Sequence, residues 1–254
     1  MSALLSLRSV SKTFGGLAAV KSLSLDVERG AIVSLIGPNG AGKSTVFNLI
    51  TGIYAPTDGT ISLDGRALNG MKPSAVAASG IMRTFQNIRL FAFMSVLDNV
   101  MVGRHVRMRA AVWDGAFHTP SARREESAVA QSAMQLLEFV GLRRYAHEWA
   151  RNLPYGMQRR LEIARALAPE PSLLLLDEPA AGTNPAEKQA LMDLVTSIRD
   201  RGVTVLLIEH DMRLVMGISD EIHVLDYGEK IAAGLPETVR RDPRVIEAYL
   251  GKGA

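Results

Sequence analysis

The chain contains no cysteine, and this absence excludes disulfide bridges and thiolate metal sites. It also fits a reducing compartment. Charge of one sign is scarce as well: the formal net charge of the 254 residues is +3, and basic pairs such as Arg143-Arg144 and Arg240-Arg241 are scattered. So small an excess gives no reason to expect a nucleic acid as partner, and we interpret these pairs as solvated surface.

Long hydrophobic runs are also lacking. The apolar runs at 173–176 and 203–208 fall far short of the roughly 20 residues that a bilayer-spanning helix needs. The first residues, "MSALLSLRSVSK", have neither a charged n-region nor a long apolar h-region, so they do not resemble a signal peptide. We therefore expect a cytoplasmic protein, unless a partner holds it at a membrane.

Hydrophobic residues make up 47% of the chain, enough for one large domain with a full core. Apolar and polar residues alternate in 4–12 and 21–28, which predicts strands of a half-buried sheet. Residues 31–37, "AIVSLIG", predict a strand buried on both faces. A helix follows and is closed by Gly52, and "GTISLDG" at 59–65 predicts another short strand.

Residues 95–152 predict an inserted helical sub-domain, which a stretch of turn and aromatic residues, "AAVWDGAFHTPS", interrupts at 110–121. The core would then comprise residues 1–94 and 153–254. Behind the insertion, helices and strands alternate, which predicts a parallel sheet covered by helices. The helices are expected at 157–168, 185–200 and 211–217, and the strands at 172–177, 203–208 and 221–226.

The stretch "GPNGAGKST" at 37–45 fits the pattern G-x-x-x-x-G-K-[ST] and lies between a buried strand and a helix, the context that this pattern requires. Its glycines let backbone N–H groups surround a polyphosphate at a helix N-terminus. Lys43 can reach the β- and γ-phosphates, and the Ser44 hydroxyl can bind Mg²⁺. The pattern leaves kinase, GTPase and ATPase open, although no guanine-reading Asn-Lys-x-Asp run occurs.

Two carboxylates, Asp177 and Glu178, follow four leucines in "SLLLLDEP". The carboxyl end of a buried strand faces the ligand crevice of an open α/β sheet, which suits Asp177 for the Mg²⁺ shell. Glu178 is placed to orient or deprotonate an attacking water. Since a kinase does not need the second carboxylate, the pair favours hydrolysis; the alternative is a strand capped by solvated acids.

Two further polar residues follow predicted strands. His210 comes after "VTVLLIE" and can donate a hydrogen bond to the γ-phosphate, although a lone histidine is often structural. Gln86 comes after "GIMRTF" and carries both a donor and an acceptor, so it can contact Mg²⁺ and the attacking water.

Taken in their order along the chain, the phosphate loop, the Gln86 stretch, the Asp177-Glu178 stretch and the His210 stretch resemble the nucleotide-binding subunit of an ATP-binding cassette (ABC) transporter. "GPNGAGKST" resembles Walker A, "LLLLDEP" Walker B, Gln86 the Q-loop and His210 the H-loop. Phe14, in "KTFGGL", stands where the family places an aromatic that stacks on adenine; the neighbouring glycines favour a loop, and the alternative is a core phenylalanine. The resemblance implies an α/β P-loop NTPase fold with a mixed or parallel sheet core, an N-terminal antiparallel β sub-domain and the helical insertion.

The residues that the resemblance implies for nucleotide and metal can be grouped by role. Those expected to act in hydrolysis are Glu178, His210, Gln86 and Lys43, and those expected to bind Mg²⁺ are Ser44, Gln86 and Asp177. Those expected to bind ATP are Phe14, Gly37, Pro38, Asn39, Gly40, Ala41, Gly42, Lys43, Ser44 and Thr45.

Several longer stretches resemble one subunit of the branched-chain amino-acid uptake systems: "RTFQNIRLFAFMSVLDNVMVGRH", "WDGAFHTP", "YGMQRRLEIARAL", "DEPAAGTNP" and "PRVIEAYLG". Importers of urea, short amides and other amino acids, and the lipopolysaccharide-export ATPase, are related alternatives. The resemblance implies a second cassette as partner, two permease subunits, a periplasmic binding protein and the cytoplasmic face of a bacterial inner membrane. A soluble ABC ATPase of DNA repair or translation is disfavoured, because no long coiled coil or second cassette is present.

The sequence departs from the family in its signature, usually Leu-Ser-Gly-Gly-Gln. Pro154 and Tyr155 replace the Ser and the first Gly, and Met157 replaces the Gln. Thr183-Asn184 stands where Leu-Asp is usual. Because the family's two cassettes sandwich two ATP molecules, each between one Walker A and the other signature, these changes predict a weakened contribution to the partner's nucleotide and an asymmetric heterodimer.

Overall fold

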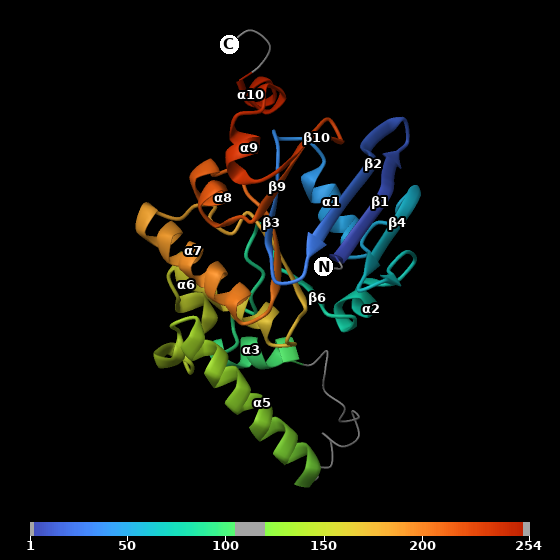
Figure 1. Ribbon diagram of the computed structural model, residues 1–254. Coiled ribbons are helices and arrows are strands. Elements are labelled where there is room, and N and C mark those ends of the chain that lie inside the picture. The colour runs from blue at the N-terminus through green and yellow to red at the C-terminus, as the bar shows by residue number, and fades with distance from the viewer. Residues whose placement is uncertain (1–2, 105–119, 251–254) are drawn as a thin grey trace. The chain divides into compact units, whose positions relative to one another are not determined.

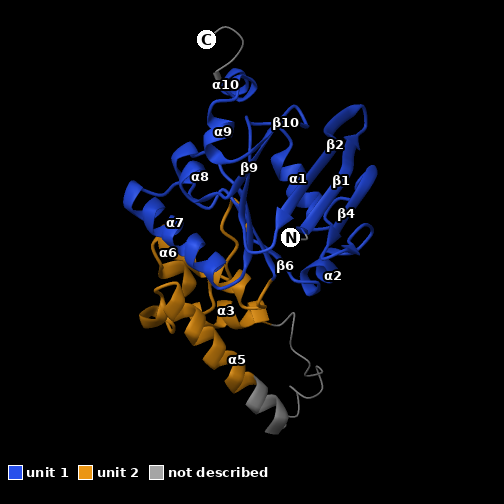
Figure 2. Ribbon diagram, in the orientation of Figure 1, with its two compact units in different colours: residues 1–83, 172–254 blue, residues 84–171 orange. Residues whose placement is uncertain are grey.

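The computed structural model describes residues 3–104 and 120–250. They form two compact units (Figure 2): unit 1 comprises residues 1–83 and 172–254, and unit 2 comprises residues 84–171. Most of the insert "WDGAFHTP" that contributes to the resemblance, residues 113–119, lies outside the described residues. Within the described ranges, no helix combines the length and the apolar character that crossing a bilayer requires.

Unit 1 contains two sheets (Figure 1). The first is antiparallel, in the order β2-β1-β4-β5, and its strands are β1 (Ala3–Phe14), β2 (Leu17–Glu28), β4 (Asp58–Leu63) and β5 (Arg66–Ala67). The second has the order β10-β9-β3-β8-β7-β6, and its strands are β3 (Ile32–Ile36), β6 (Ile81–Arg83), β7 (Leu173–Asp177), β8 (Thr204–Ile208), β9 (Glu221–Asp226) and β10 (Glu229–Gly234). Only the β9–β10 pair of the second sheet is antiparallel.

The helices of unit 1 are α1 (Lys43–Ile50), α2 (Pro73–Ala78), α7 (Pro185–Asp200), α8 (Met212–Ile218), α9 (Pro236–Arg240) and α10 (Pro243–Leu250). Unit 2 contains α3 (Val96–Arg104), α5 (Pro120–Phe139), α6 (Tyr155–Leu167) and the short 3₁₀ turns Arg143–Tyr145 and Ala150–Asn152. The elements expected from periodicity are confirmed within a few residues. β10, α2, α9 and α10 are additions, because short elements give little periodic signal.

Two apolar clusters hold unit 1 together. The larger one joins the antiparallel sheet and α1 to one face of the second sheet, and it includes Leu7, Phe47 and Leu175. The smaller one lies under α8, α9 and α10 and includes Val224 and Val245. All residues of β3, β7 and β8 are buried, as expected for parallel strands covered on both faces.

His223 of β9 is a buried titratable group of this fold, 3% exposed. Burial, reinforced by the Lys230 ammonium, lowers the pKa of His223 from 6.5 to about 4. A histidine that is neutral in the folded state stabilises the fold above its unfolded pKa, and this stability is lost as the pH falls from 6.5 towards 4.

Between pH 7 and pH 4, we therefore expect the unfolding free energy of the wild type to fall by on the order of 3 kcal/mol more than that of His223→Leu. Urea titrations at a series of pH values measure this difference. Exposed His147 provides the control, since His147→Gln should leave the pH dependence unchanged. If the unfolding free energy depends on pH equally in the wild type and in His223→Leu, His223 does not cause the loss of stability in acid.

Candidate active site

The loop between β3 and α1 is built for an anion. Gly40 and Gly42 have φ values of +82° and +103°, in the left-handed region that glycine tolerates. A Cβ on Gly42 would lie 2.5 Å from the Ala19 carbonyl oxygen, so only glycine fits. Gly42 precedes the first turn of α1 and offers no side-chain cap, which leaves the N-terminal N–H groups of this helix for a ligand.

Lys43 is 8% exposed, and its ammonium donates hydrogen bonds to the carbonyl oxygens of Gly37 at 2.7 Å and Pro38 at 2.9 Å. Burial lowers the pKa of Lys43, while the charges of Glu178 and Asp177 act in the opposite direction. The ammonium is thus held at the loop by neutral carbonyl groups, which a phosphate can replace with a stronger, charged partner.

The carboxyl ends of the neighbouring strands β7 and β8 meet beside this loop. The strands pair in parallel, with Asp177 opposite Ile208, and β8 also pairs with β3. The His210 Nδ1 lies 3.8 Å from the Glu178 carboxylate. Glu178 has a positive φ of 46°, a strained conformation for a residue other than glycine. The structure therefore brings the adjacent residues Asp177 and Glu178 together with Lys43 and His210, which are distant from them in the sequence.

Buried Glu209 fixes the loops that carry these groups, and sequence reasoning missed it. Its carboxylate accepts hydrogen bonds from the backbone N–H of Ala180 at 2.8 Å and of His210 at 3.1 Å. Burial raises the pKa of Glu209, and the backbone hydrogen bonds oppose this rise. Because one carboxylate binds the residues after both strands, it sets the spacing between Glu178 and His210.

Arg83 is a second group that sequence reasoning missed. Its guanidinium donates to the Asp177 carboxylate at 2.7 Å and to the Asn48 side-chain oxygen at 2.7 Å, and it lies over the Phe47 ring. The Arg83 and Asp177 side chains are each 8% exposed, so this is a buried ion pair. The only hint of this role in the sequence is that Arg83 is a charged residue directly after the apolar stretch "GIM".

Phe14 is the last residue of β1, at the tip of the β1–β2 hairpin, so the expectation of a loop position is wrong. The hairpin continues to Phe14 because its backbone pairs with Leu17 across the Gly15-Gly16 turn. The Phe14 side chain is 41% exposed, which also excludes the core alternative. It meets Tyr54 edge to face at a centroid distance of 5.1 Å, which leaves an accessible aromatic platform.

In unit 2, Pro154 precedes α6, which begins at Tyr155 rather than at the expected residue 157. The Pro154 carbonyl accepts from the N–H groups of Met157 and Gln158. Proline has no N–H, so Tyr155 and Gly156 carry the N–H groups left for a ligand at this helix start. The motif thus retains donors but lacks a hydroxyl at its second position.

Gln86 belongs to unit 2. There, hydrogen bonds from a buried ion pair of α6 hold the backbone of the segment around Gln86. Arg159 is 1% exposed and donates to the carbonyl oxygens of Phe85 at 2.6 Å and Gln86 at 2.7 Å. It also pairs with Glu162 at 2.8 Å. Since both partners are buried and form hydrogen bonds with the segment around Gln86, they make this segment and α6 one structural piece within unit 2.

The comparisons with known proteins agree with this geometry. Residues 20–181 match the family model of the ABC transporter, which covers more than half of the chain. The chain belongs to the ABC transporter family. A second model, the branched-chain amino acid ATP-binding cassette transporter, matches residues 229–254 of this ABC protein.

Two curated relatives are similar over nearly their whole length. The high-affinity branched-chain amino acid transport ATP-binding protein LivG of Escherichia coli K12 is 49% identical over 250 residues, which are 98% of each chain. The corresponding protein BraF of Pseudomonas aeruginosa is 48% identical, also over 98% of each chain. Among solved structures, an ATP-binding cassette of an ABC transporter in its ADP conformation has a TM-score of 0.86, with 30% identity, 99% of this chain and 100% of that one covered.

Proposed function

We propose that this ABC protein binds ATP with Mg²⁺ at its phosphate loop and hydrolyses the ATP to energise the import of branched-chain amino acids. One observation carries the proposal: Lys43, Asp177, Glu178 and His210 meet at the carboxyl ends of three adjacent strands. The printed names of the relatives and the model matched at residues 229–254 support this cargo class.

Each group has a role that follows from its position. The loop 37–45 surrounds the phosphates, and Lys43 exchanges its two carbonyl partners for phosphate oxygens. Glu178 orients and deprotonates the attacking water, while His210 beside it donates to the γ-phosphate. Phe14 stacks on adenine from the hairpin tip.

The residues present fit a magnesium ion. Mg²⁺ usually takes only one or two protein ligands and fills its other positions with phosphate oxygens and water. In the part of the chain that the structure describes, no group of three His, Asp or Glu side chains could hold a metal by itself. Ser44 and Asp177 of unit 1 would hold the ion, and Gln86 remains the further ligand predicted from the sequence; the bound ion would neutralise charge on the transferred phosphoryl group.

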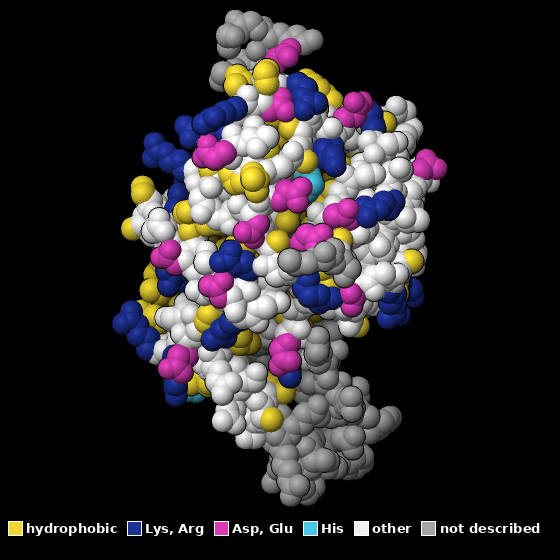
Figure 3. All heavy atoms as spheres, viewed as in Figure 1, with side chains coloured by type: hydrophobic (Ala, Val, Ile, Leu, Met, Phe, Trp, Pro, Cys, Tyr) yellow, Lys and Arg dark blue, Asp and Glu magenta, His cyan; other side chains and the backbone are white. Residues whose placement is uncertain are grey.

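We expect the protein to act with a second cassette and two permeases, which receive substrate from a periplasmic binding protein. Its place would be the cytoplasmic face of the membrane, as a peripheral subunit. On the face shown in Figure 3, basic and acidic side chains are interspersed. Among the described residues of this one face, no continuous basic track of the kind that nucleic acids bind is visible.

The nucleotide site can be tested on the purified chain by ATP titration and by phosphate release. Lys43→Ala should lose ATP affinity and hydrolysis together, because the ammonium is the charge closest to the loop. Exposed Lys72 is the matched control, and Lys72→Ala should behave as the wild type. Unchanged ATP binding in Lys43→Ala would contradict the proposed site.

An aromatic patch in unit 2 is the proposed contact with the permease. It consists of Phe91, Phe93, Trp149 and Arg151, and Phe93 is 70% exposed. The Phe93 and Trp149 rings meet edge to face at 6.0 Å, and the Arg151 guanidinium lies 4.8 Å from the Phe93 ring centre. Exposed aromatics of this kind mark protein interaction sites, and here they could receive a short permease helix.

Phe93→Glu should therefore abolish transport by the assembled complex while the isolated chain still binds ATP. The charge would be buried against an apolar partner surface, whereas in the free chain it faces water. Tyr227, exposed in unit 1, offers a matched control in Tyr227→Glu. If Phe93→Glu lowers the unfolding free energy of the isolated chain by several kcal/mol, the side chain belongs to the core instead.

A further inference from the structure

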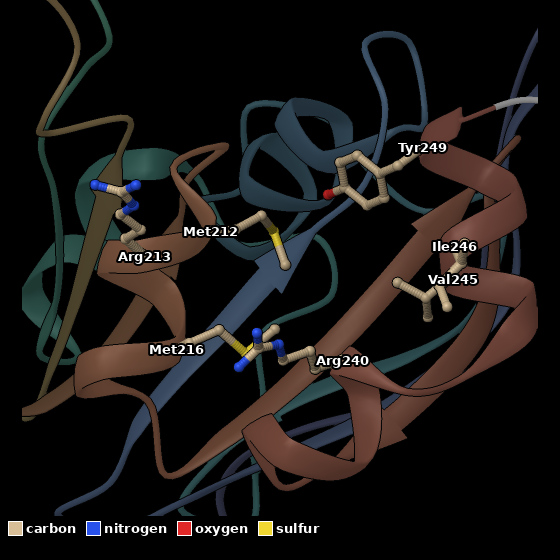
Figure 4. Close-up of a pocket in the computed structure, with 7 residues that line it drawn as sticks. All are labelled: Met212, Arg213, Met216, Arg240, Val245, Ile246 and Tyr249. Atoms are coloured by element: carbon tan, nitrogen blue, oxygen red, sulfur yellow. The ribbon is translucent and has the colours of Figure 1, made fainter.

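A cavity of about 440 Å³ lies between α8, α9 and α10 of unit 1 (Figure 4). Its lining is mostly apolar, and the lining residues are Met212, Arg213, Met216, Arg240, Val245, Ile246 and Tyr249. The volume is within the range of small-molecule sites, and methionines adapt to varied ligand shapes. Nothing in the nucleotide site proposed above uses this cavity.

One cation gives the cavity its polarity. In Figure 4 the Arg240 side chain extends from α9 toward Met216, whereas Arg213 is directed away from the middle of the cavity. No ion pair of Arg240 occurs among residues 3–104 and 120–250. In the described part of the chain, no acidic side chain lines the cavity, so a ligand with an ammonium group would find no partner there. This combination fits an aliphatic body that ends in one carboxylate.

The cavity walls are connected to two parts of the nucleotide site, the segment with His210 and the phosphate loop. α8 begins at Met212, two residues after His210, and the side chain of its N-cap, Asp211, accepts hydrogen bonds from the Arg213 and Leu214 N–H groups. Tyr249 comes from α10, and its hydroxyl lies near the backbone N–H of Gly37, the first glycine of the phosphate loop. Gly37 is tightly packed, since a Cβ there would lie 2.0 Å from the Leu225 carbonyl oxygen.

We propose that this cavity is a regulatory site for an aliphatic monocarboxylate, and that its occupancy changes nucleotide affinity through Tyr249 and Gly37. Four of the lining residues, Arg240, Val245, Ile246 and Tyr249, come from the segment 229–254 that matches the branched-chain cassette model. The binding step stands independently of the proposed function. The coupling step rests on the nucleotide site at the phosphate loop.

Calorimetric titration of the purified full chain with decanoate tests the binding step. Decanoate should bind, whereas decylamine and decanol, which have the same chain, should bind at least about tenfold more weakly because they lack the negative charge. Arg240→Gln should weaken decanoate binding by about tenfold or more. Arg241→Gln, at the neighbouring arginine that does not line the cavity, should change it less than about twofold. Ile246→Trp, which fills the cavity, should abolish binding while ATP binding persists.

Equal binding of the three probes, or equal effects of the two arginine variants, would overturn the carboxylate assignment. Tight binding of leucine, a zwitterion, would also overturn it. Binding to vesicles with anionic lipids, but not to decanoate, would show a membrane contact instead of a small-molecule site and would refute the proposal.

The coupling step is tested by titrating ADP with and without saturating decanoate. We expect ADP affinity to change by about fivefold or more, and Tyr249→Phe should retain decanoate binding but lose this change. A wild-type chain that binds both ligands without mutual effect would refute the coupling. A chain that binds decanoate but no nucleotide would instead refute the proposed function.

Discussion

Replacing Glu178 by Gln is expected to lower ATP hydrolysis by about a hundredfold or more while ATP binding is retained. The amide has nearly the shape of the carboxylate but cannot accept a proton. Asp177, the proposed metal ligand, and Lys43, the proposed phosphate ligand, remain in place. Phosphate release and nucleotide titration on the same preparation measure the two quantities separately.

Glu148, exposed in unit 2, supplies the matched control, because Glu148→Gln makes the same chemical change away from the site. The effect of Glu178→Gln should also exceed that of His210→Ala, since His210 is assigned a hydrogen bond rather than the proton transfer. Near-normal turnover in Glu178→Gln would remove Glu178 from the role of base.

Restoring the signature is expected to accelerate hydrolysis by the isolated chain. The double change Pro154→Ser and Met157→Gln returns a hydroxyl and an N–H to the start of α6, where Tyr155 and Gly156 now carry the remaining donors. A hydrogen bond to a charged group is worth about 1.5–3 kcal/mol, which corresponds to roughly 10–100-fold in rate. Single-turnover rates at saturating ATP measure the gain.

In the isolated chain, this gain requires two copies that face each other, because each signature serves the nucleotide held by the other copy. In a heterodimer with a cassette that has an intact signature, two unequal ATP sites would form. The efficient site would combine the phosphate loop and Glu178 of this chain with the partner's signature, and the weaker site would use the signature of this chain. Glu178→Gln should therefore impair the assembled transporter more than the equivalent change in the partner. Rapid cooperative hydrolysis by the unmodified chain, or equal losses from the two changes, would contradict the asymmetry.

Most of the parallel sheet could be predicted because its strands are continuous apolar runs that end in functional residues. "SLLLLDEP" indicates both a buried strand and the position of Asp177, and "VTVLLIEHD" does the same for His210. Alternation also predicted the two strands of the N-terminal hairpin, but not their full length, and their antiparallel arrangement was implied by the family resemblance. Phe14 extends β1 because hydrogen bonding across the turn outweighs the tendency of its glycine neighbours to form a loop.

The sequence could not predict the side-chain interactions that support the site, because their two partners are distant along the chain. Arg83 and Asp177 are 94 residues apart, and Glu209 binds the backbone of Ala180 across 29 residues. Neither pairing leaves a local pattern. The cavity beside α10 is also absent from any motif, because it arises from three short helices that each bury one face. The strained Glu178 backbone follows from tertiary constraints rather than from local preference.

The central claim is that ATP held at the phosphate loop of this chain energises the import of branched-chain amino acids. Its most direct test is leucine uptake into proteoliposomes that contain the assembled transporter, with ATP and Mg²⁺ on the side of this subunit. We predict uptake that requires ATP, is competed by isoleucine and valine but not by urea, and is lost in Lys43→Ala. Leucine uptake that continues undiminished in Lys43→Ala would contradict the account.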